Sequence, residues 1–309
     1  MFRSIIEDLI HQFASGNMIT RIVIINVAVF VFVNLIYFFS THLNAGHTPR
    51  FFTEFIHYLS VSSDMLEFFL RPWTWITSMF LHQGFWHILW NMLFLYWFGR
   101  IVGDLIGDHR ILPIYIMGGL AGALAFFLSA NVFGYNAGGT AYALGASGAV
   151  MALVTASGVL APDYRMNLIL IGEVKLKWVV AVLIFLDLIG TASNINTGGH
   201  FAHLGGVLMG WVYIMQLRDG KELGAWVNNV KDTINSMFRS AGSSSRSGSK
   251  IRVVHRAASK KEVHFERKDR TADFQAELDR ILDKIKAKGY DGLTEEEKDF
   301  LYQASNKDQ

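Results

Sequence analysis

Two long stretches of this chain are almost without charge, and they limit what it can fold into. No Asp, Glu, Lys or Arg occurs between Arg110 and Asp163, and Asp187 is the only one between Lys177 and Arg218. A helix needs about 20 apolar residues to cross a bilayer, so each stretch is long enough to cross twice. Charged residues make up only 17% of the chain. The sequence therefore predicts a helical membrane domain.

Six apolar segments are predicted to be transmembrane helices, which makes the expected fold class all-α, a polytopic membrane helix bundle. Lys and Arg gather in the loops on the side of the N-terminus, whereas the opposite side has only Arg50 and Arg71, both in its long first loop. The positive-inside rule therefore places both termini in the cytoplasm. The segments run approximately over residues 22–40, 85–102, 111–130, 147–161, 178–192 and 201–217.

The chain is predicted to divide into four parts. Residues 1–17 form an amphipathic cytoplasmic helix, and residues 18–218 form the six-span domain. Residues 219–271 form a flexible basic linker, and residues 272–309 form a small soluble helical hairpin. The N-terminal helix is expected to lie on the membrane surface, because its apolar residues recur at helical spacing.

The two C-terminal parts differ in composition. The linker is rich in Gly and Ser and carries a basic excess, so it could bind anionic lipid, or it could be a solvated connector with no ligand. In the last part, Phe274, Leu278, Ile281, Leu282 and Ile285 make one helix face. A second helix is expected to open with a capping box, in which Thr294 precedes Glu297 by three positions.

The chain has no cysteine, which excludes disulfides, a thiol nucleophile and thiolate metal sites. It also has no His-Glu-x-x-His zinc motif. Four histidines, His82, His87, His200 and His203, leave open a membrane metalloprotease or metal transporter. His82 and His87 are five residues apart and do not share a helix face, so we expect no metal. We also expect no cofactor and no nucleic-acid partner.

Ser147 is a candidate nucleophile at the start of the fourth predicted helix. It lies in the sequence Gly145-Ala146-Ser147-Gly148, where an uncharged loop enters the membrane. Backbone N–H groups at a helix N-terminus lack partners within the helix, and the helix dipole is positive there, so both would stabilise an oxyanion beside Ser147. The glycines Gly145 and Gly148 would let a substrate backbone approach closely. By itself the pattern is more often a serine N-cap.

His203, in the sixth predicted helix, is a candidate general base, because an imidazole accepts a proton near neutral pH. Gly206 and Gly210 follow it and form a ridge of small residues that allows another helix to pack closely. The fourth helix offers a matching face that begins at Gly148. If these faces meet, Ser147 and His203 lie at the same depth of the membrane. A buried histidine hydrogen-bonded between helices is the alternative.

His87 and Asn91 are candidate oxyanion donors, because they lie four residues apart on one face of the second predicted helix. Both side chains can donate hydrogen bonds. Ordinary hydrogen bonding between helices is the alternative. The polar motifs occur in the order His82-x4-His87-x3-Asn91, Gly145-x-Ser147-Gly148 and Ala202-His203-x2-Gly206-x3-Gly210.

This set of motifs over six spans, residues 18–218, resembles the rhomboid intramembrane serine proteases. The resemblance implies a dyad without an acidic third member, in which Ser147 attacks and His203 acts as base. It implies an oxyanion site of His87, Asn91 and the backbone N–H of Ser147, with His82 near a water-access cavity. The implied substrates are single-span membrane proteins, cut near the outer face.

The resemblance also implies a location, the inner membrane of a bacterium, because the soluble tail is similar to tails of some bacterial members. The active site is expected to open to the outer face of this membrane. Three positions depart from the family pattern. Trp73-Thr74 replaces Trp-Arg in the first loop, and Gly103 occupies the position of a glutamate. Met151 occupies an aromatic position, and its thioether is expected to pack on the base.

Asp187 lies within the fifth predicted helix, where a charged side chain is costly. We favour a structural hydrogen bond or a neutral, protonated acid over an acid that orients His203. Two further functions stay open. A rhomboid-like protein could bind membrane proteins without cutting them, and a secondary transporter would need an inverted repeat, which the sequence does not show.

Overall fold

The computed structural model describes residues 2–135, 138–168, 171–193, 195–242, 278–281, 283–286 and 292–305. The chain divides into two compact units, Met1–Ser245 and Arg246–Gln309. Each of the six apolar segments is helical in the first unit, so the protein is mostly helical, as expected. These helices are α2 (Met18–Leu43), α6 (Phe85–Ile106), α7 (Ile111–Phe133), α8 (Ser147–Leu160), α9 (Leu176–Gly190) and α10 (Thr197–Arg218).

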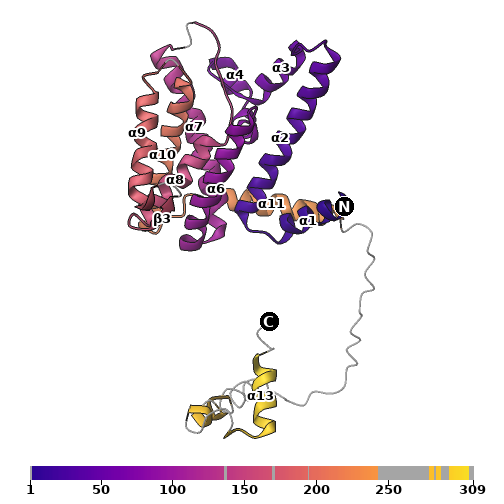
Figure 1. Cartoon of the computed structure of the whole chain (residues 1–309), viewed down its shortest axis with the longest axis vertical. Coiled ribbons are helices and arrows are strands. Elements are labelled where there is room, and N and C mark those ends of the chain that lie inside the picture. The colour runs from indigo at the N-terminus through magenta and orange to yellow at the C-terminus, as the bar shows by residue number, and fades with distance from the viewer. Residues whose placement is uncertain are drawn as a thin grey trace, which may run out of the picture. The chain divides into compact units, whose positions relative to one another are not determined.

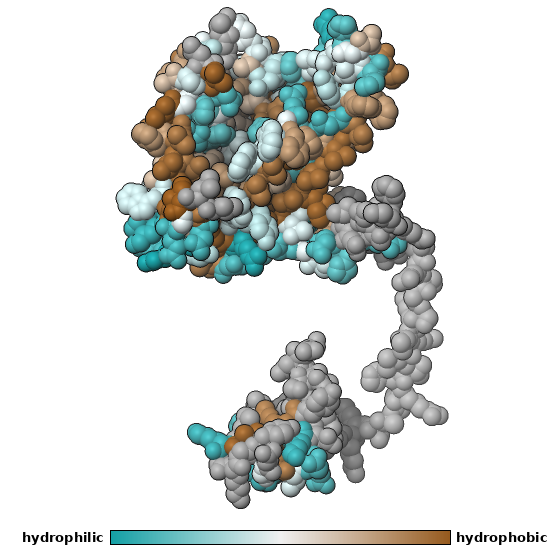
Figure 2. Space-filling view, in the orientation of Figure 1, coloured by the Kyte–Doolittle hydropathy of each residue, from teal (hydrophilic) through white to brown (hydrophobic). Residues whose placement is uncertain are grey.

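The six helices differ in length and hydropathy. By length and composition, two helical stretches of the described residues could cross a membrane, Met18–Leu43 and Asp108–Phe133. The helix Ser147–Leu160 is apolar but shorter. Figure 1 shows α2 and α6 to α10 standing in one bundle, with α1 (Phe2–Ser15) and α11 (Ala225–Gly242) running across one end. Figure 2 shows hydrophobic side chains over α2 and hydrophilic ones gathered near β3 at that same end.

Helix α8 lies at the centre of the first unit, and residues 148–157 are all buried. It packs against α10 through backbone contacts that only glycine permits. A Cβ at Gly206 would lie 2.0 Å from the carbonyl oxygen of Gly148, and one at Gly210 would lie 2.2 Å from that of Ala152. The small faces of the fourth and sixth helices therefore meet, as the spacing of their glycines indicates.

Helix α7 completes this core. A Cβ at Gly118 would lie 2.3 Å from the Cβ of Ala152 in α8, and one at Gly122 would lie 2.9 Å from the carbonyl oxygen of Ala202 in α10. Small residues thus bring α7 and α10 together around α8. Because the approach is set by backbone atoms, which cannot move aside as a flexible side chain can, the relative positions of these helices are tightly determined.

Two short antiparallel β pairs depart from the all-α expectation. Strand β1 (Val61–Ser62) pairs with β2 (Tyr142–Ala143), and Val61 lies opposite Ala143. Strand β3 (Arg165–Leu168) pairs with β4 (Gly172–Lys175) in the loop between α8 and α9. Strands of two to four residues are too short to produce a readable alternation of apolar and polar residues.

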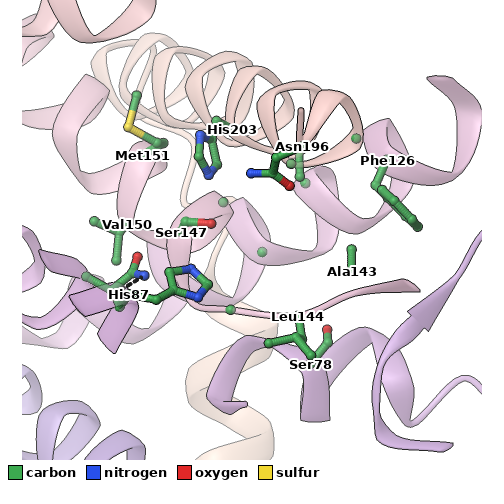
Figure 3. Close-up of a pocket in the computed structure, with 18 of the residues that line it drawn as sticks. Ser78, His87, Phe126, Ala143, Leu144, Ser147, Val150, Met151, Asn196 and His203 are labelled. Carbon is green, nitrogen blue, oxygen red and sulfur yellow. Dashed lines mark hydrogen bonds between the residues drawn. The ribbon is translucent and has the colours of Figure 1, made fainter. Parts of the chain in front are cut away.

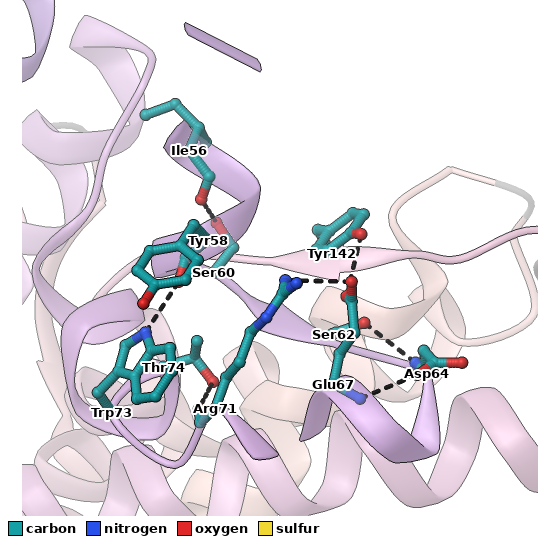
Figure 4. Close-up of polar contacts among 10 residues, drawn as sticks. All are labelled: Ile56, Tyr58, Ser60, Ser62, Asp64, Glu67, Arg71, Trp73, Thr74 and Tyr142. Atoms are coloured by element: carbon teal, nitrogen blue, oxygen red, sulfur yellow. Dashed lines mark hydrogen bonds and ion pairs between the residues drawn. The ribbon is translucent and has the colours of Figure 1, made fainter. Parts of the chain in front are cut away.

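The long first loop is ordered by polar contacts (Figure 4). Arg71 forms an ion pair with Glu67, with 3.1 Å between Nη1 and Oε1, and the hydroxyl of Tyr142 donates to Glu67 Oε2 over 3.1 Å. Trp73 Nε1 donates to the carbonyl of Tyr58 over 3.0 Å. This loop therefore does contain an arginine, Arg71, which precedes the Trp73-Thr74 pair by two residues. The contacts attach the loop to β2, which leads into α8.

Four helical elements follow one another in this loop. The first of them buries Phe52 and Ile56, which lie four residues apart on one face of the helix. The elements are α3 (Arg50–Leu59), α4 (Met65–Leu70), α5 (Thr74–Thr77) and the 3-10 helix η1 (Ser78–Phe80). A second 3-10 helix, η2 (Asp108–Arg110), joins α6 to α7.

Part of the predicted flexible linker is helical, which corrects the boundary expected at residue 218. Residues Ala225–Gly242 form α11, whose Trp226, Val230 and Ile234 recur at intervals of four residues. This spacing is the amphipathic signal that sequence reasoning missed. Asn228 Nδ2 in α11 donates to the carbonyl of His109 over 3.2 Å, which attaches the helix to the loop before α7. The rest of the linker, residues 243–271, lies outside the described residues.

The second unit contains helical residues 278–281 and 283–286 and helix α13 (Glu295–Ser305). The expected capping box is present: the backbone N–H of Thr294 donates to Glu297 Oε2 over 2.8 Å, and that of Glu297 donates to Thr294 Oγ1 over 3.4 Å. Ile281 is buried. Phe274 and Leu282 lie outside the described residues, so the helical hairpin as a whole stays a prediction.

We predict that Gly206→Ala separates α8 from α10. Its new methyl group would meet the backbone of Gly148, and overpacking of this kind typically destabilises a protein by about 1–3 kcal/mol. The midpoint of thermal unfolding in detergent should fall. Gly103→Ala is the matched control, because a Cβ there would lie 3.7 Å from Ile111, an ordinary contact. Equal unfolding midpoints for the two variants would contradict the packing.

The second unit should lose stability in acid. Hydrogen bonds from the ammonium of Lys284 and the backbone N–H of Thr294 lower the pKa of Glu297 from 4.5 to about 2. A lowered folded-state pKa means that the contribution is complete above pH 4.5 and is lost as the pH falls through about 2. Backbone NMR signals of α13 in the full chain should report this loss. Glu297→Gln keeps the capping geometry without the charge, so it should remove the pH dependence.

Candidate functional site

Ser147 is the first residue of α8, as the sequence predicted. The backbone before it is held in place on both sides. The N–H of Gly145 donates to the carbonyl of Ser78 over 2.8 Å, and the N–H of Ala146 donates to His82 Nε2 over 3.2 Å. Gly145 has a φ of 125°, a conformation that other residues adopt only with strain. The hydroxyl is thus presented by a rigid turn at a helix N-terminus, where backbone N–H groups lack helical partners.

His82 has a structural position. The resemblance places it near a water-access cavity, but in the structure its side chain is fully buried and it accepts a hydrogen bond from Ala146. It therefore holds the turn that precedes the candidate nucleophile.

His87 and Asn91 lie on α6 and face the turn before Ser147. A Cβ at Gly145 would lie 2.7 Å from His87 Cε1, so the absence of a side chain there makes room for the imidazole. Asn91 Nδ2 donates to the carbonyl of His87 over 2.9 Å, which orients its amide and uses one of its two N–H bonds. The second N–H is left for another acceptor. Both residues line the pocket that contains Ser147.

His203 lies on α10 and contacts Asp187 of α9. Its Nδ1 is 2.7 Å from Asp187 Oδ1, and His200 Nδ1 is 2.8 Å from the same oxygen. The hydrogen bond expected of Asp187 is made to His203 itself, and the preference for a structural over an orienting role stays a prediction. Sequence reasoning missed the pairing with His200, although Asp187 stood out as the one charged residue between Lys177 and Arg218.

The candidate catalytic and oxyanion residues line one pocket of about 980 Å³, whereas His82, Gly206 and Gly210 are not among its lining residues. In Figure 3 the hydroxyl of Ser147 lies between the imidazole rings of His87 and His203. No hydrogen bond joins Ser147 to His203 among the contacts of the described residues. Met151 lines the same pocket and is buried, and its expected packing on the ring of His203 stays a prediction. The pocket also includes Asn91, Gly145, Gly148 and Asp187.

Of the histidines weighed as metal ligands, His200 and His203 form a group with Asp187. The three ligand atoms lie within 4.8 Å of one another, close enough for one cation. All three already take part in short hydrogen bonds, which account for the cluster without an ion. His82 and His87 are not part of this group.

Comparison with known proteins gives two matches to families. Residues 70–219, close to half of the chain, match the model of the rhomboid domain. Residues 267–307 match a family of unknown function (DUF6576).

Several curated proteins are similar to this chain. Presenilin-associated rhomboid-like protein A, a mitochondrial protein of Danio rerio, is 30% identical over 141 residues, which cover 45% of this chain and 36% of that protein. The mitochondrial Rhomboid protein 1 of Saccharomyces cerevisiae is 30% identical over 139 residues, 45% of this chain and 40% of that protein. Rhomboid protease GluP of Bacillus subtilis is 28% identical over 183 residues, 59% of this chain and 32% of that protein.

The chain thus spans 32% to 40% of the length of these three relatives. The matched segment, residues 70–219, contains every candidate catalytic and oxyanion residue. Domain match, motifs and relatives agree: this chain is a membrane protein with a rhomboid domain over residues 70–219.

Proposed function

We propose that the chain is an intramembrane serine endopeptidase in which Ser147 is the nucleophile and His203 the general base. The observation that carries the proposal is the convergence of two helices: α8 and α10 touch through Gly148 and Gly206, and their Ser147 and His203 line one pocket. Relatives that bear the name rhomboid protease support it.

In the proposed reaction, Ser147 Oγ attacks the carbonyl carbon of the scissile peptide bond. His203 takes the hydroxyl proton and later gives it to the leaving amine, so that an acyl-enzyme ester remains. Water then attacks the ester, His203 takes a proton from this water, and the proton returns to Ser147 as the new carboxyl terminus leaves. No metal or cofactor enters these steps.

The oxyanion of the tetrahedral intermediate would be stabilised by His87, Asn91 and the backbone N–H of Ser147. Three features support this assignment: His87 and Asn91 line the pocket, Asn91 retains an unused N–H, and Ser147 begins α8. Donors that are already oriented before the reaction stabilise a developing negative charge without further reorganisation.

The proposed setting is a membrane crossed by six helices, α2 and α6 to α10, with both termini in the cytoplasm and the pocket opening to the outer face. Substrates would be single-span membrane proteins, which reach the pocket from the bilayer. Anionic lipid at the basic linker is a further proposed partner. Because relatives occur both in mitochondria and in Bacillus subtilis, the bacterial inner membrane stays a proposal.

A catalytically silent rhomboid-like protein that binds membrane proteins or serves their quality control is the second candidate. One observation favours it: Ser147 and His203, both described, are not hydrogen-bonded to each other. In resting enzymes such hydrogen bonds are often long and shorten only in the complex with substrate, so the observation does not exclude catalysis.

We predict that Ser147→Ala or His203→Ala abolishes cleavage of a single-span test substrate in proteoliposomes, because each removes a reacting group. Asn91→Ala should lower kcat by about 10²- to 10³-fold, the usual effect of losing one oxyanion donor. Substrate fragments on gels measure the rates. Turnover by purified Ser147→Ala equal to that of the wild type would refute the proposal.

A fluorophosphonate probe should label Ser147 of the wild type, because the probe reacts with activated serines. Labelling should be absent in Ser147→Ala, which is the control for specificity, and mass spectrometry identifies the modified residue. A folded wild type that neither cleaves substrates nor accepts the probe would favour the silent binding protein.

Chelators should leave activity unchanged, because no proposed step uses a metal. We expect kcat to stay within about twofold of its value after treatment with EDTA or 1,10-phenanthroline, a change below 0.5 kcal/mol. Activity that is lost on chelation and restored by added zinc would instead show that Asp187, His200 and His203 bind a catalytic ion.

A further inference from the structure

We propose that Asp187 is a positioning residue for His203, and that His200 holds Asp187 in place. Asp187 would keep the imidazole of His203 in the tautomer that can take the proton of Ser147. The inference rests on the proposed function, and it extends the two-residue mechanism that the motifs imply by an acidic third member and its own support.

The tautomer follows from the contacts. An ionised carboxylate can only accept hydrogen bonds, so with Asp187 ionised the Nδ1 of His203, 2.7 Å from Asp187 Oδ1, carries the proton. Neutral imidazole has one N–H, which leaves Nε2 with a free lone pair. Nε2 is therefore the atom that can act as base. The other tautomer, with the proton on Nε2, would lose the hydrogen bond to Asp187 and could not accept a proton from Ser147.

A second donor supports Asp187 in this position. A charged side chain within a membrane helix is costly, by about 2.5–3.5 kcal/mol at the helix centre on insertion scales. His200 Nδ1 lies 2.8 Å from the same oxygen, so an ionised Asp187 accepts a hydrogen bond from two imidazoles through Oδ1. His200 and His203 lie three residues apart, on one face of α10. Two hydrogen-bond donors thus offset the free-energy cost of burying one carboxylate.

Helix α9 makes room for this arrangement. A Cβ at Gly190 would lie 2.4 Å from His200 Cε1, so the ring of His200 occupies the space that a side chain would take. Gly190 follows Asp187 by three residues on the same helix. The carboxylate and the gap that admits its second partner are therefore both features of α9, and both partners belong to α10.

A bridge that only joins α9 to α10 would give the same contacts, and kinetics separates the two roles. A bridge acts on stability, whereas a positioning residue acts on the chemical step. The tests use the full-length protein in proteoliposomes, with kcat and KM measured separately for a single-span substrate and the unfolding midpoint measured alongside.

Asp187→Asn keeps an acceptor oxygen of the same shape but removes the charge. We expect kcat to fall by about 100-fold or more with little change in KM, since loss of the corresponding carboxylate in a Ser-His-Asp triad lowers kcat by about 10⁴-fold. Labelling of Ser147 by a fluorophosphonate should slow in parallel. A folded Asp187→Asn whose kcat stays within about threefold of the wild type would overturn the inference.

Gly190→Ala tests the support without touching the carboxylate. Its methyl group should displace the ring of His200 and lower kcat by about tenfold, the effect of one hydrogen bond to a charged group. Gly103→Ala, where the added methyl makes an ordinary contact, is the control. Equal kcat for the two variants would remove His200 from the proposal.

An NMR measurement keeps this inference separate from the proposed function. In protein with ¹⁵N-labelled histidine, the Nδ1–H of His203 should give a strongly downfield proton signal. The signal should persist in Ser147→Ala, disappear in His203→Ala and be lost or shifted in Asp187→Asn. Its absence from the wild type would refute the positioning role even if cleavage is observed. Its presence in a wild type that does not cleave would refute the proposed function alone.

Discussion

The close approach of α8 and α10 is the contact on which the rest of the structure depends. Gly206 and Gly210 let the backbone of α10 lie directly against the carbonyl oxygens of Gly148 and Ala152. Lipid tails are as apolar as leucine side chains, so apolar burial alone does little to drive helices together in a membrane, and close backbone packing becomes important. This contact brings the hydroxyl of Ser147 into one pocket with polar groups from α10.

Around that contact, the polar groups of the first unit form two sets of contacts. The first set fixes the backbone before α8: Ser78 and His82 accept hydrogen bonds from its N–H groups, and β2 pairs with β1 of the folded first loop. The second set fixes the imidazole of His203, which contacts Asp187, and Asp187 in turn contacts His200. Groups held by their own partners need little reorganisation when charge develops, which is the property that serine chemistry requires of its surroundings.

Much of the site was readable from residue types and spacing. Ser147 stood at a helix start, and the glycine spacing after His203 predicted the packing of two helices, because side-chain periodicity is a local property. The partners of Asp187 were not readable, since they depend on the rotation of α9 against α10. The same holds for the burial of His82 behind the turn and for the pairing of β1 with β2, which joins segments about eighty residues apart.

The sequence by itself determined a helical membrane protein with six apolar helices and a rhomboid domain, because hydropathy and motif order are written along the chain. Only the tertiary structure decided which polar atoms meet. Asp187 contacts His203 because α9 and α10 place the two side chains 2.7 Å apart, and a distance between two helices is a property of their packing, which no single segment encodes.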